Sequence, residues 1–447
     1  MKATTKLVAM LVGLVLIGVP SGIAGKKATI ALDGRLATPF MSERGGMASL
    51  QISLKASHWA DDRTRRPMNI AVVLDRSGSM GHEQKMDHAK SALRTIINQL
   101  SSDDIFSLVI YDNEVDVLRP AGRVRNKNHI VTLVDEIYPR GSTNLGGGMT
   151  EGLRQAARNG SREYVNRVIL LSDGLANQGI TDKRELEQIA YEYRDRGISL
   201  TSMGVGLEYN EDLMMGLAES GGGNYYFIES GHGLAGVLQK EFNSLSVMLA
   251  QDATIELKLG RGVRVEDIVG CKYTTTRDHV TIDLGSVVSN DRRDITVRLS
   301  VPAQCDGEKK LLVAKGSLNY ESEKIRIASV EPFDVSVTYT RDVAVIEKNR
   351  DMKAQADADV ALSTRMVEQA LKLLDAGKHD EAVVQMEMAE TALMASPAAA
   401  GTSDSKDAVM EQSARLRSYK ETVQSETDAR KSKKAIQYHN YQTQKKK

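Results

Sequence analysis

Three oxygen-bearing side chains follow an apolar run in the first fifth of the chain and have the types and spacing of metal ligands. The run IAVVL, residues 70–74, leads into DRSGSM, where Asp75, Ser77 and Ser79 alternate with other residues. Such a run is typical of a buried parallel strand, and ligands of open α/β sheets bind beyond the carboxyl ends of the strands. Because a carboxylate and two hydroxyls are hard oxygen donors, the spacing predicts a site for Mg²⁺ or another hard cation.

In this pattern the chain resembles the von Willebrand factor A (VWA) family and its metal-ion-dependent adhesion site. That site combines D-x-S-x-S with a distant threonine and a distant aspartate, and the chain offers Thr143 in GSTNL and Asp173 in LLSDG. The resemblance covers residues 66–250, and SGSM, GSTNL, LLSDGLAN and GGGNYYFI are similar to exported bacterial members. It implies a doubly wound α/β sheet, a surface-exposed Mg²⁺ (or Mn²⁺ or Ca²⁺), and a partner protein that offers a Glu or Asp carboxylate.

Each of these side chains also has a plainer explanation. Ser77 and Ser79 could cap a helix, Thr143 could cap the helix that begins near residue 146, and Asp173 could belong to an ordinary turn. Together, however, they fall at strand ends or helix starts on the same rim of the expected sheet. Two carboxylates roughly balance the charge of a divalent ion, so we expect one shared metal site.

Residues 66–250 alternate apolar runs with amphipathic stretches, as doubly wound parallel sheets do. The expected strands after the first are 105–111, an edge strand at 114–118, 167–172, 199–205 and 224–228. The expected helices are 86–100, 129–137, 146–157, 183–194, 211–217 and 234–249.

Period-two patterns on both sides of this region predict a second, antiparallel fold. Apolar residues alternate with polar ones at 50–56 and repeatedly between 252 and 340, which is typical of a β-sandwich. We infer that strands in 25–65 complete a sandwich formed by 251–342, so that the VWA-like domain is an insertion. The two cysteines, Cys271 and Cys305, fall in this sandwich, and an oxidising compartment would favour a disulfide between them.

The last part of the chain, residues 343–447, has helical patterns. Helices are expected at 360–374 and 381–394, separated by Gly377, and again at 407–429. The hairpin is similar to a tetratricopeptide unit, but a plain helical hairpin that docks or dimerises is the alternative, because repeat arrays need about three units. The final lysines have no acidic neighbour and predict a solvated, frayed tail: Lys431, Lys433, Lys434, Lys445, Lys446 and Lys447.

The first residues have the pattern of a signal peptide. Lys2 and Lys6 precede an apolar run at 7–19, and small residues follow up to Ala24. We expect cleavage after residue 24 and a periplasmic or secreted protein, with an uncleaved membrane anchor as the alternative. Membrane contact is expected only in that second case.

Composition and missing motifs narrow the function. The 59 basic and 59 acidic residues cancel, and aromatic residues make up 4%, which disfavours nucleic-acid binding. Phosphate-loop and nucleophile-elbow motifs are missing, and Met86 stands where a zinc-protease motif beginning at His82 needs histidine. We therefore expect a cation-dependent protein-binding module for adhesion or scaffolding, not an enzyme, whose C-terminal helices could engage a second partner. The alternatives are a metal-assisted hydrolase and an accessory subunit of an ATP-driven assembly.

Overall fold

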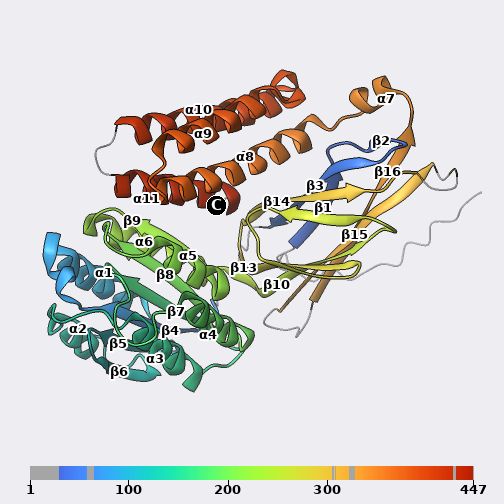
Figure 1. The fold of residues 1–447 in the computed structure, drawn as a ribbon. Coiled ribbons are helices and arrows are strands. Elements are labelled where there is room, and N and C mark those ends of the chain that lie inside the picture. The colour runs from blue at the N-terminus through green and yellow to red at the C-terminus, as the bar shows by residue number, and fades with distance from the viewer. Residues whose placement is uncertain are drawn as a thin grey trace, which may run out of the picture.

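The computed structural model describes residues 30–57, 65–304, 307, 309–321, 328–425 and 429–445. The expected signal peptide, Cys305, Lys446 and Lys447 lie outside these residues. Figure 1 shows three parts: an α/β part, a β part beside it, and a layer of helices that spans both.

The α/β part is built on a six-stranded sheet with the order β6-β5-β4-β7-β8-β9. Neighbouring strands are parallel, except that β6 runs antiparallel to β5 at the edge. This confirms the expected doubly wound fold and puts the strand that precedes the D-x-S-x-S segment at the centre. The strands are β4 (Met68–Asp75), β5 (Ile105–Tyr111), β6 (Val115–Arg123), β7 (Val165–Ser172), β8 (Ser199–Val205) and β9 (Gly222–Ile228).

Helices cover both faces of this sheet, so successive residues of β4 enter different cores. Ile70, Val72 and Leu74 pack with α1, α2 and α6, whereas Ala71 and Val73 pack with α3, α4 and α5. Burial on both faces explains why the strand is apolar without alternation. The helices are α1 (Lys85–Gln99), α2 (Lys127–Asp135), α3 (Leu145–Arg158), α4 (Lys183–Asp195), α5 (Glu211–Ser220) and α6 (Leu234–Ser246).

The β part consists of two sheets that share one hydrophobic core. Their orders are β1-β3-β14-β11 and β12-β13-β10-β15-β16-β2. β3 pairs antiparallel with β14, with Ile52 opposite Ile295, so strands from the two sides of the α/β part are neighbours in space. The strands are β1 (Ile30–Leu36), β2 (Phe40–Ser42), β3 (Gly46–Ala56), β10 (Met248–Leu259), β11 (Arg264–Ile268), β12 (Tyr273–Thr276), β13 (His279–Val288), β14 (Arg292–Val301), β15 (Lys310–Glu321) and β16 (Ala328–Thr340).

The C-terminal region is helical, as expected, with its own apolar core. α8 begins before the expected residue 360, because the side chain of Asp351 caps it by accepting from the backbone N–H of Ala354. None of the described helices is long and apolar enough to cross a membrane. The helices are α7 (Val343–Lys348), α8 (Met352–Asp375), α9 (His379–Met394), α10 (Ser403–Ser425) and α11 (Ala429–Lys445).

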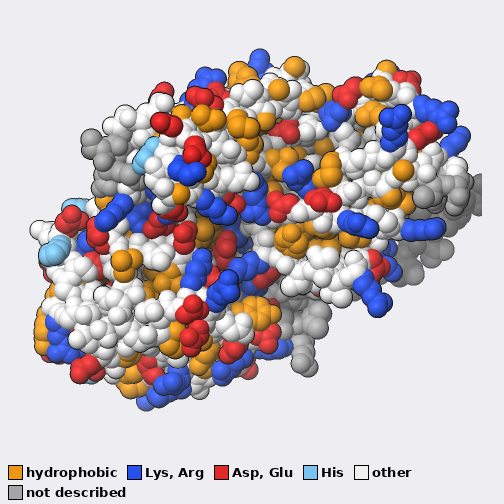
Figure 2. Space-filling view, viewed as in Figure 1, with side chains coloured by type: hydrophobic (Ala, Val, Ile, Leu, Met, Phe, Trp, Pro, Cys, Tyr) orange, Lys and Arg blue, Asp and Glu red, His pale blue; other side chains and the backbone are white. Residues whose placement is uncertain are grey.

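The expectation of a frayed basic tail is wrong for residues 429–445. These residues form α11, which lies against the α/β part, and Lys434 is only 2% exposed. Lys433 and Lys434 both pair with Glu211, and Lys431 pairs with Glu229. Figure 2 shows basic and acidic side chains together where the helical layer meets the α/β part. The acidic partners of this tail come from α5 and from the end of β9, so they are not its neighbours in the sequence.

Candidate metal centre

The D-x-S-x-S segment lies where the central strand ends. Asp75 is the last residue of β4 and is fully buried, and its Oδ1 accepts a hydrogen bond of 2.8 Å from the backbone N–H of Ser77. The chain then turns into a short 3₁₀ helix, η1 (Gly78–Gln84), which contains Ser79. This turn directs the two serine hydroxyls to within 3.1 Å of each other.

Asp173 enters the same site from the neighbouring strand. It follows β7 directly, and its Oδ1 accepts a hydrogen bond of 2.7 Å from the hydroxyl of Ser79. The preceding residue, Ser172, donates to Oδ2 of Asp75 at 2.7 Å. Because β4 and β7 are adjacent and parallel, their carboxyl ends bring both aspartates to one rim.

Thr143 reaches the site from the loop before α3. A Cβ placed on Gly174 would lie 3.0 Å from Oγ1 of Thr143 and 3.8 Å from Oγ of Ser79, so the three residues are close. The backbones of Thr143 and Asn177 tie the two loops together: the Thr143 N–H donates to the Asn177 side chain, and the Asn177 N–H donates to the Thr143 carbonyl. Gly174 is a residue that the sequence analysis did not single out, although S-D-G marks the turn.

The plainer explanations for two of the hydroxyls do not hold. Ser77 precedes η1 but makes no capping hydrogen bond with its side chain. The side chain that caps α3 belongs to Asn144, which accepts from the N–H of Gly147, and not to Thr143. Both hydroxyls are therefore available to the site at the rim.

Burial and hydrogen bonds have opposite effects on the charge of the Asp75 carboxyl. Burial raises the pKa of the Asp75 carboxyl to about 6, although hydrogen bonds from Ser77 and Ser172 favour the charged form. Tyr111 lies beneath, fully buried, and its hydroxyl donates to the carbonyl of Leu171 at 3.2 Å. Burial raises the pKa of Tyr111 well above 10, so the phenol stays neutral and adds no charge. A positive ion next to Asp75 would favour the carboxylate.

Lys85 was missed by the sequence analysis. Its ammonium nitrogen lies 2.9 Å from Oδ2 of Asp173, and its side chain is 7% exposed. The expected helix began at residue 86, so its apolar face did not include this lysine. The one available signal was a basic residue shortly after the D-x-S-x-S segment.

Ion pairs behind the candidate ligands hold the loop that carries Thr143. The Arg76 side chain, 9% exposed, pairs with Asp112 at 3.0 Å and with Asp116 at 2.6 Å. Asp112 also pairs with Arg140 at 2.7 Å, and the backbone N–H of Arg140 donates to the Arg76 carbonyl. These contacts fix the loop against the residue that follows Asp75.

The donors at the rim are chemically suited to a hard divalent cation. The site offers two carboxylates and three hydroxyls, all oxygen, and no thiolate or imidazole among its hydrogen-bonded side chains. Among the described residues, no three His, Cys, Asp or Glu side chains are grouped so that they could hold a metal. The hydroxyls are therefore essential members of any metal site at this rim.

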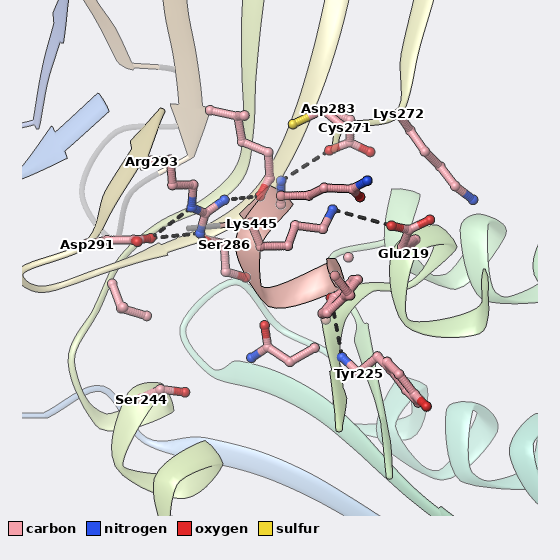
Figure 3. Close-up of a pocket in the computed structure, with 18 of the residues that line it drawn as sticks. Glu219, Tyr225, Ser244, Cys271, Lys272, Asp283, Ser286, Asp291, Arg293 and Lys445 are labelled. Atoms are coloured by element: carbon pink, nitrogen blue, oxygen red, sulfur yellow. Dashed lines mark hydrogen bonds and ion pairs between the residues drawn. The ribbon is translucent and has the colours of Figure 1, made fainter. Parts of the chain in front are cut away.

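A separate cavity lies where the α/β part, the β part and α11 meet (Figure 3). Its volume is about 240 Å³, and the described residues that line it include none of the five candidate ligands. Cys271 lines it, and burial raises the pKa of its thiol. Because Cys305 lies outside the described residues, the disulfide between the two stays a prediction.

Comparisons with known proteins agree with this architecture. Residues 69–240 match the model of the von Willebrand factor type A domain. The chain is 29% identical over 209 residues to the uncharacterized protein YfbK of Escherichia coli (strain K12), covering 46% of this chain and 36% of that protein. It is 27% identical over 194 residues to inter-alpha-trypsin inhibitor heavy chain H2 of Sus scrofa, covering 42% of this chain and 21% of that protein. The chain thus spans only a minor part of these relatives.

Two solved structures share the fold over most of the chain. A von Willebrand factor type A protein from Catenulispora acidiphila aligns with a TM-score of 0.71 at 14% identity, covering 93% of this chain and 96% of that one. The ArnB paralog VWA2 from Sulfolobus acidocaldarius aligns with a TM-score of 0.60 at 17% identity, covering 92% and 98%. At these identities the likeness shows the fold alone, and it extends beyond the α/β part. The family match thus identifies residues 69–240 of this chain as a von Willebrand factor type A domain, and the two structures share its fold.

Proposed function

We propose that the chain is a non-enzymatic, divalent-cation-dependent module that binds a partner protein through its VWA domain. Asp75, Ser77, Ser79, Thr143 and Asp173 would hold Mg²⁺, or Mn²⁺ or Ca²⁺ in its place. A Glu or Asp carboxylate of the partner would take the coordination position left towards solvent. The observation that carries the proposal is the 2.7 Å contact between Ser79 and Asp173, which joins the ends of β4 and β7 in one oxygen-lined site.

The charges of the site favour such a partner. A bound divalent ion would supply a positive centre that attracts a carboxylate, and three of the five protein donors are neutral hydroxyls. Ser79 is partly exposed, whereas the other four candidate ligands are buried, so a ligand would approach from the side of Ser79. The aspartates would then anchor the ion from below.

Two exposed apolar side chains flank the loops that carry these donors. Leu175, two residues after Asp173, is 55% exposed, and Tyr138, in the loop before Thr143, is 62% exposed. Exposed aromatic and aliphatic side chains around a polar centre are suited to protein contacts. They support a protein partner over a free small anion.

A hydrolase is less well supported. The basic side chain in the site, Lys85, is engaged by Asp173 and therefore does not offer a free general base to activate water. The alternative of an accessory subunit in an ATP-driven assembly inside the cell is disfavoured by the signal-peptide pattern of residues 1–24. We further propose that the module acts in the periplasm or outside the cell, on the pattern of residues 1–24, and that the C-terminal helices are a candidate contact for a second partner.

The test is capture of partner proteins by the immobilised full chain from an extracellular or periplasmic extract, with Mg²⁺ and with chelator. Capture of a defined protein should require Mg²⁺ and fail with Asp75→Asn, which keeps the shape of the side chain. Asp103→Ala is the control, because it removes an exposed carboxylate that pairs with Arg123 at the far end of β5 from the site. Equal capture in chelator and with Asp75→Asn would contradict the proposal.

A further inference from the structure

Lys85 is built into the candidate metal centre as a buried cation. It is the first residue of α1, and its ammonium lies 2.9 Å from Oδ2 of Asp173, which is itself fully buried. The two oxygens of Asp173 thus have different partners: Oδ1 accepts from Ser79, and Oδ2 accepts from Lys85. The Asp173 carboxylate thus connects Ser79, another candidate ligand, to the buried ammonium of Lys85.

The backbone around Lys85 is shaped to hold it there. Glu83 and Gln84 have φ values of +52° and +56°, a left-handed conformation that residues other than glycine rarely adopt. This turn brings the first residue of α1 inward. On the opposite side, a Cβ on Gly206 would lie 3.1 Å from the ammonium nitrogen, so this glycine leaves the room that the lysine occupies.

The charge of the centre follows from this pair. With Asp75 and Asp173 ionised, the two carboxylates and the ammonium leave one net negative charge where a site without lysine would carry two. The ammonium stabilises Asp173 when no ion is bound, and it repels a divalent ion that binds beside the same carboxylate. Both effects act against metal binding and in favour of the metal-free protein.

We propose that Lys85 sets the affinity of this site for divalent cations by competing with the ion for Asp173. The inference rests on the proposed metal-binding function, and it gives a role to a residue that is not one of the five candidate ligands. The lysine stabilises the metal-free protein and raises the cation concentration at which the site becomes occupied.

The experiment is a calorimetric titration of the chelator-stripped full chain with Mg²⁺ alone, for the wild type, Lys85→Met and Lys85→Gln. Even with the screening of bulk water, a unit charge so close to a divalent ion changes affinity by about tenfold or more. Both variants should therefore bind Mg²⁺ at least about tenfold more tightly than the wild type. Lys90→Met is the matched control, because Lys90 lies on the same helix but donates to the carbonyl of Asp135, away from the site.

A second readout is thermal stability, with and without the ion. In chelator, Lys85→Met should melt at a lower temperature than the wild type, and Mg²⁺ should raise its melting temperature by more. Lys85→Gln keeps a hydrogen-bond donor for Asp173. It replaces Lys85→Met in this measurement if the methionine variant does not fold without the ion.

The outcomes separate the two proposals. Wild-type affinity in both Lys85 variants, with a normal Mg²⁺ response in the wild type, would overturn the role of the lysine and leave the metal site standing. No Mg²⁺ response in any protein, the wild type included, would overturn the metal site and the inference with it.

Discussion

The hydroxyl of Ser79 lies 2.7 Å from Oδ1 of Asp173, although 94 residues separate the two in the sequence. The contact exists because β4 and β7 are adjacent, parallel and central, so their carboxyl ends place both residues on one rim. It turns separate polar motifs into a single oxygen-lined centre, and the buried pair of Lys85 and Asp173 connects that centre to α1.

Asp173→Ala should destabilise the metal-free protein by about 3–5 kcal/mol, because it leaves the Lys85 ammonium buried without a partner. Urea unfolding in chelator measures this. The double variant Lys85→Met with Asp173→Ala should recover most of the loss, since the buried charge is gone. A single variant as stable as the wild type would show that the ion pair does not form in solution.

Gly174→Ala should weaken Mg²⁺ binding while leaving the fold intact. The new Cβ would lie 3.0 Å from Oγ1 of Thr143 and would push this hydroxyl from its place. Gly78→Ala is the matched control in the same site, because its Cβ would meet only the Gly141 carbonyl at 3.6 Å, an ordinary contact. Isothermal titration with Mg²⁺ compares the two, and equal affinity would argue against Thr143 as a ligand.

Glu211→Gln should loosen α11 from the VWA domain. Lys433 and Lys434 both pair with Glu211, and their side chains are 14% and 3% exposed, so its loss would cost about 3 kcal/mol. Hydrogen exchange of residues 429–445 should become faster. Glu208→Gln is the control, because its pair with Arg430 is exposed on both sides and contributes about 0–1 kcal/mol. Unchanged protection in Glu211→Gln would mean that α11 is held by its other contacts.

Acid should release the same helix. Burial alone would raise the pKa of Glu211, but hydrogen bonds from Lys433 and Lys434 lower it below its ordinary value of 4.5. A lowered folded-state pKa gives a stabilisation that is complete above the unfolded-state pKa and is lost as the pH falls through the folded value. The protection factor of α11, which corrects the exchange rate for its intrinsic pH dependence, should therefore be constant above about pH 5 and fall below 4.5. A loss of protection that begins near neutral pH would point to another group.

The VWA domain was predictable because its signals are local. The apolar run 105–111 coincides with β5, since a strand buried on both faces must be apolar throughout. The candidate ligands could be named because they match the D-x-S-x-S, GSTNL and LLSDG motifs of the family that the chain resembles, and each motif follows such a strand or precedes a helix. Several boundaries failed. The expected edge strand 114–118 runs to Arg123 as β6, and the expected helix 234–249 ends at Ser246, where the apolar residues after it open β10, because a short apolar run suits either structure.

The other errors concern contacts between distant parts of the chain. Lys434 and Glu211 are 223 residues apart, and Lys85 and Asp173 are 88 apart, so neither pair leaves a pattern in the local sequence. A lysine-rich end without acidic neighbours resembles a solvated tail until the acidic start of α5 is placed beside it. A lysine before an amphipathic helix resembles a surface residue until the strand order is known.

The most direct test of the metal centre is a crystal structure of the full chain grown with Mn²⁺, using its anomalous scattering. The account predicts a peak at the rim, in contact with Asp75, Ser77 and Ser79 and close to Thr143 and Asp173. Absence of a peak there in Mn²⁺-containing crystals, or a peak held only by other residues, would contradict it.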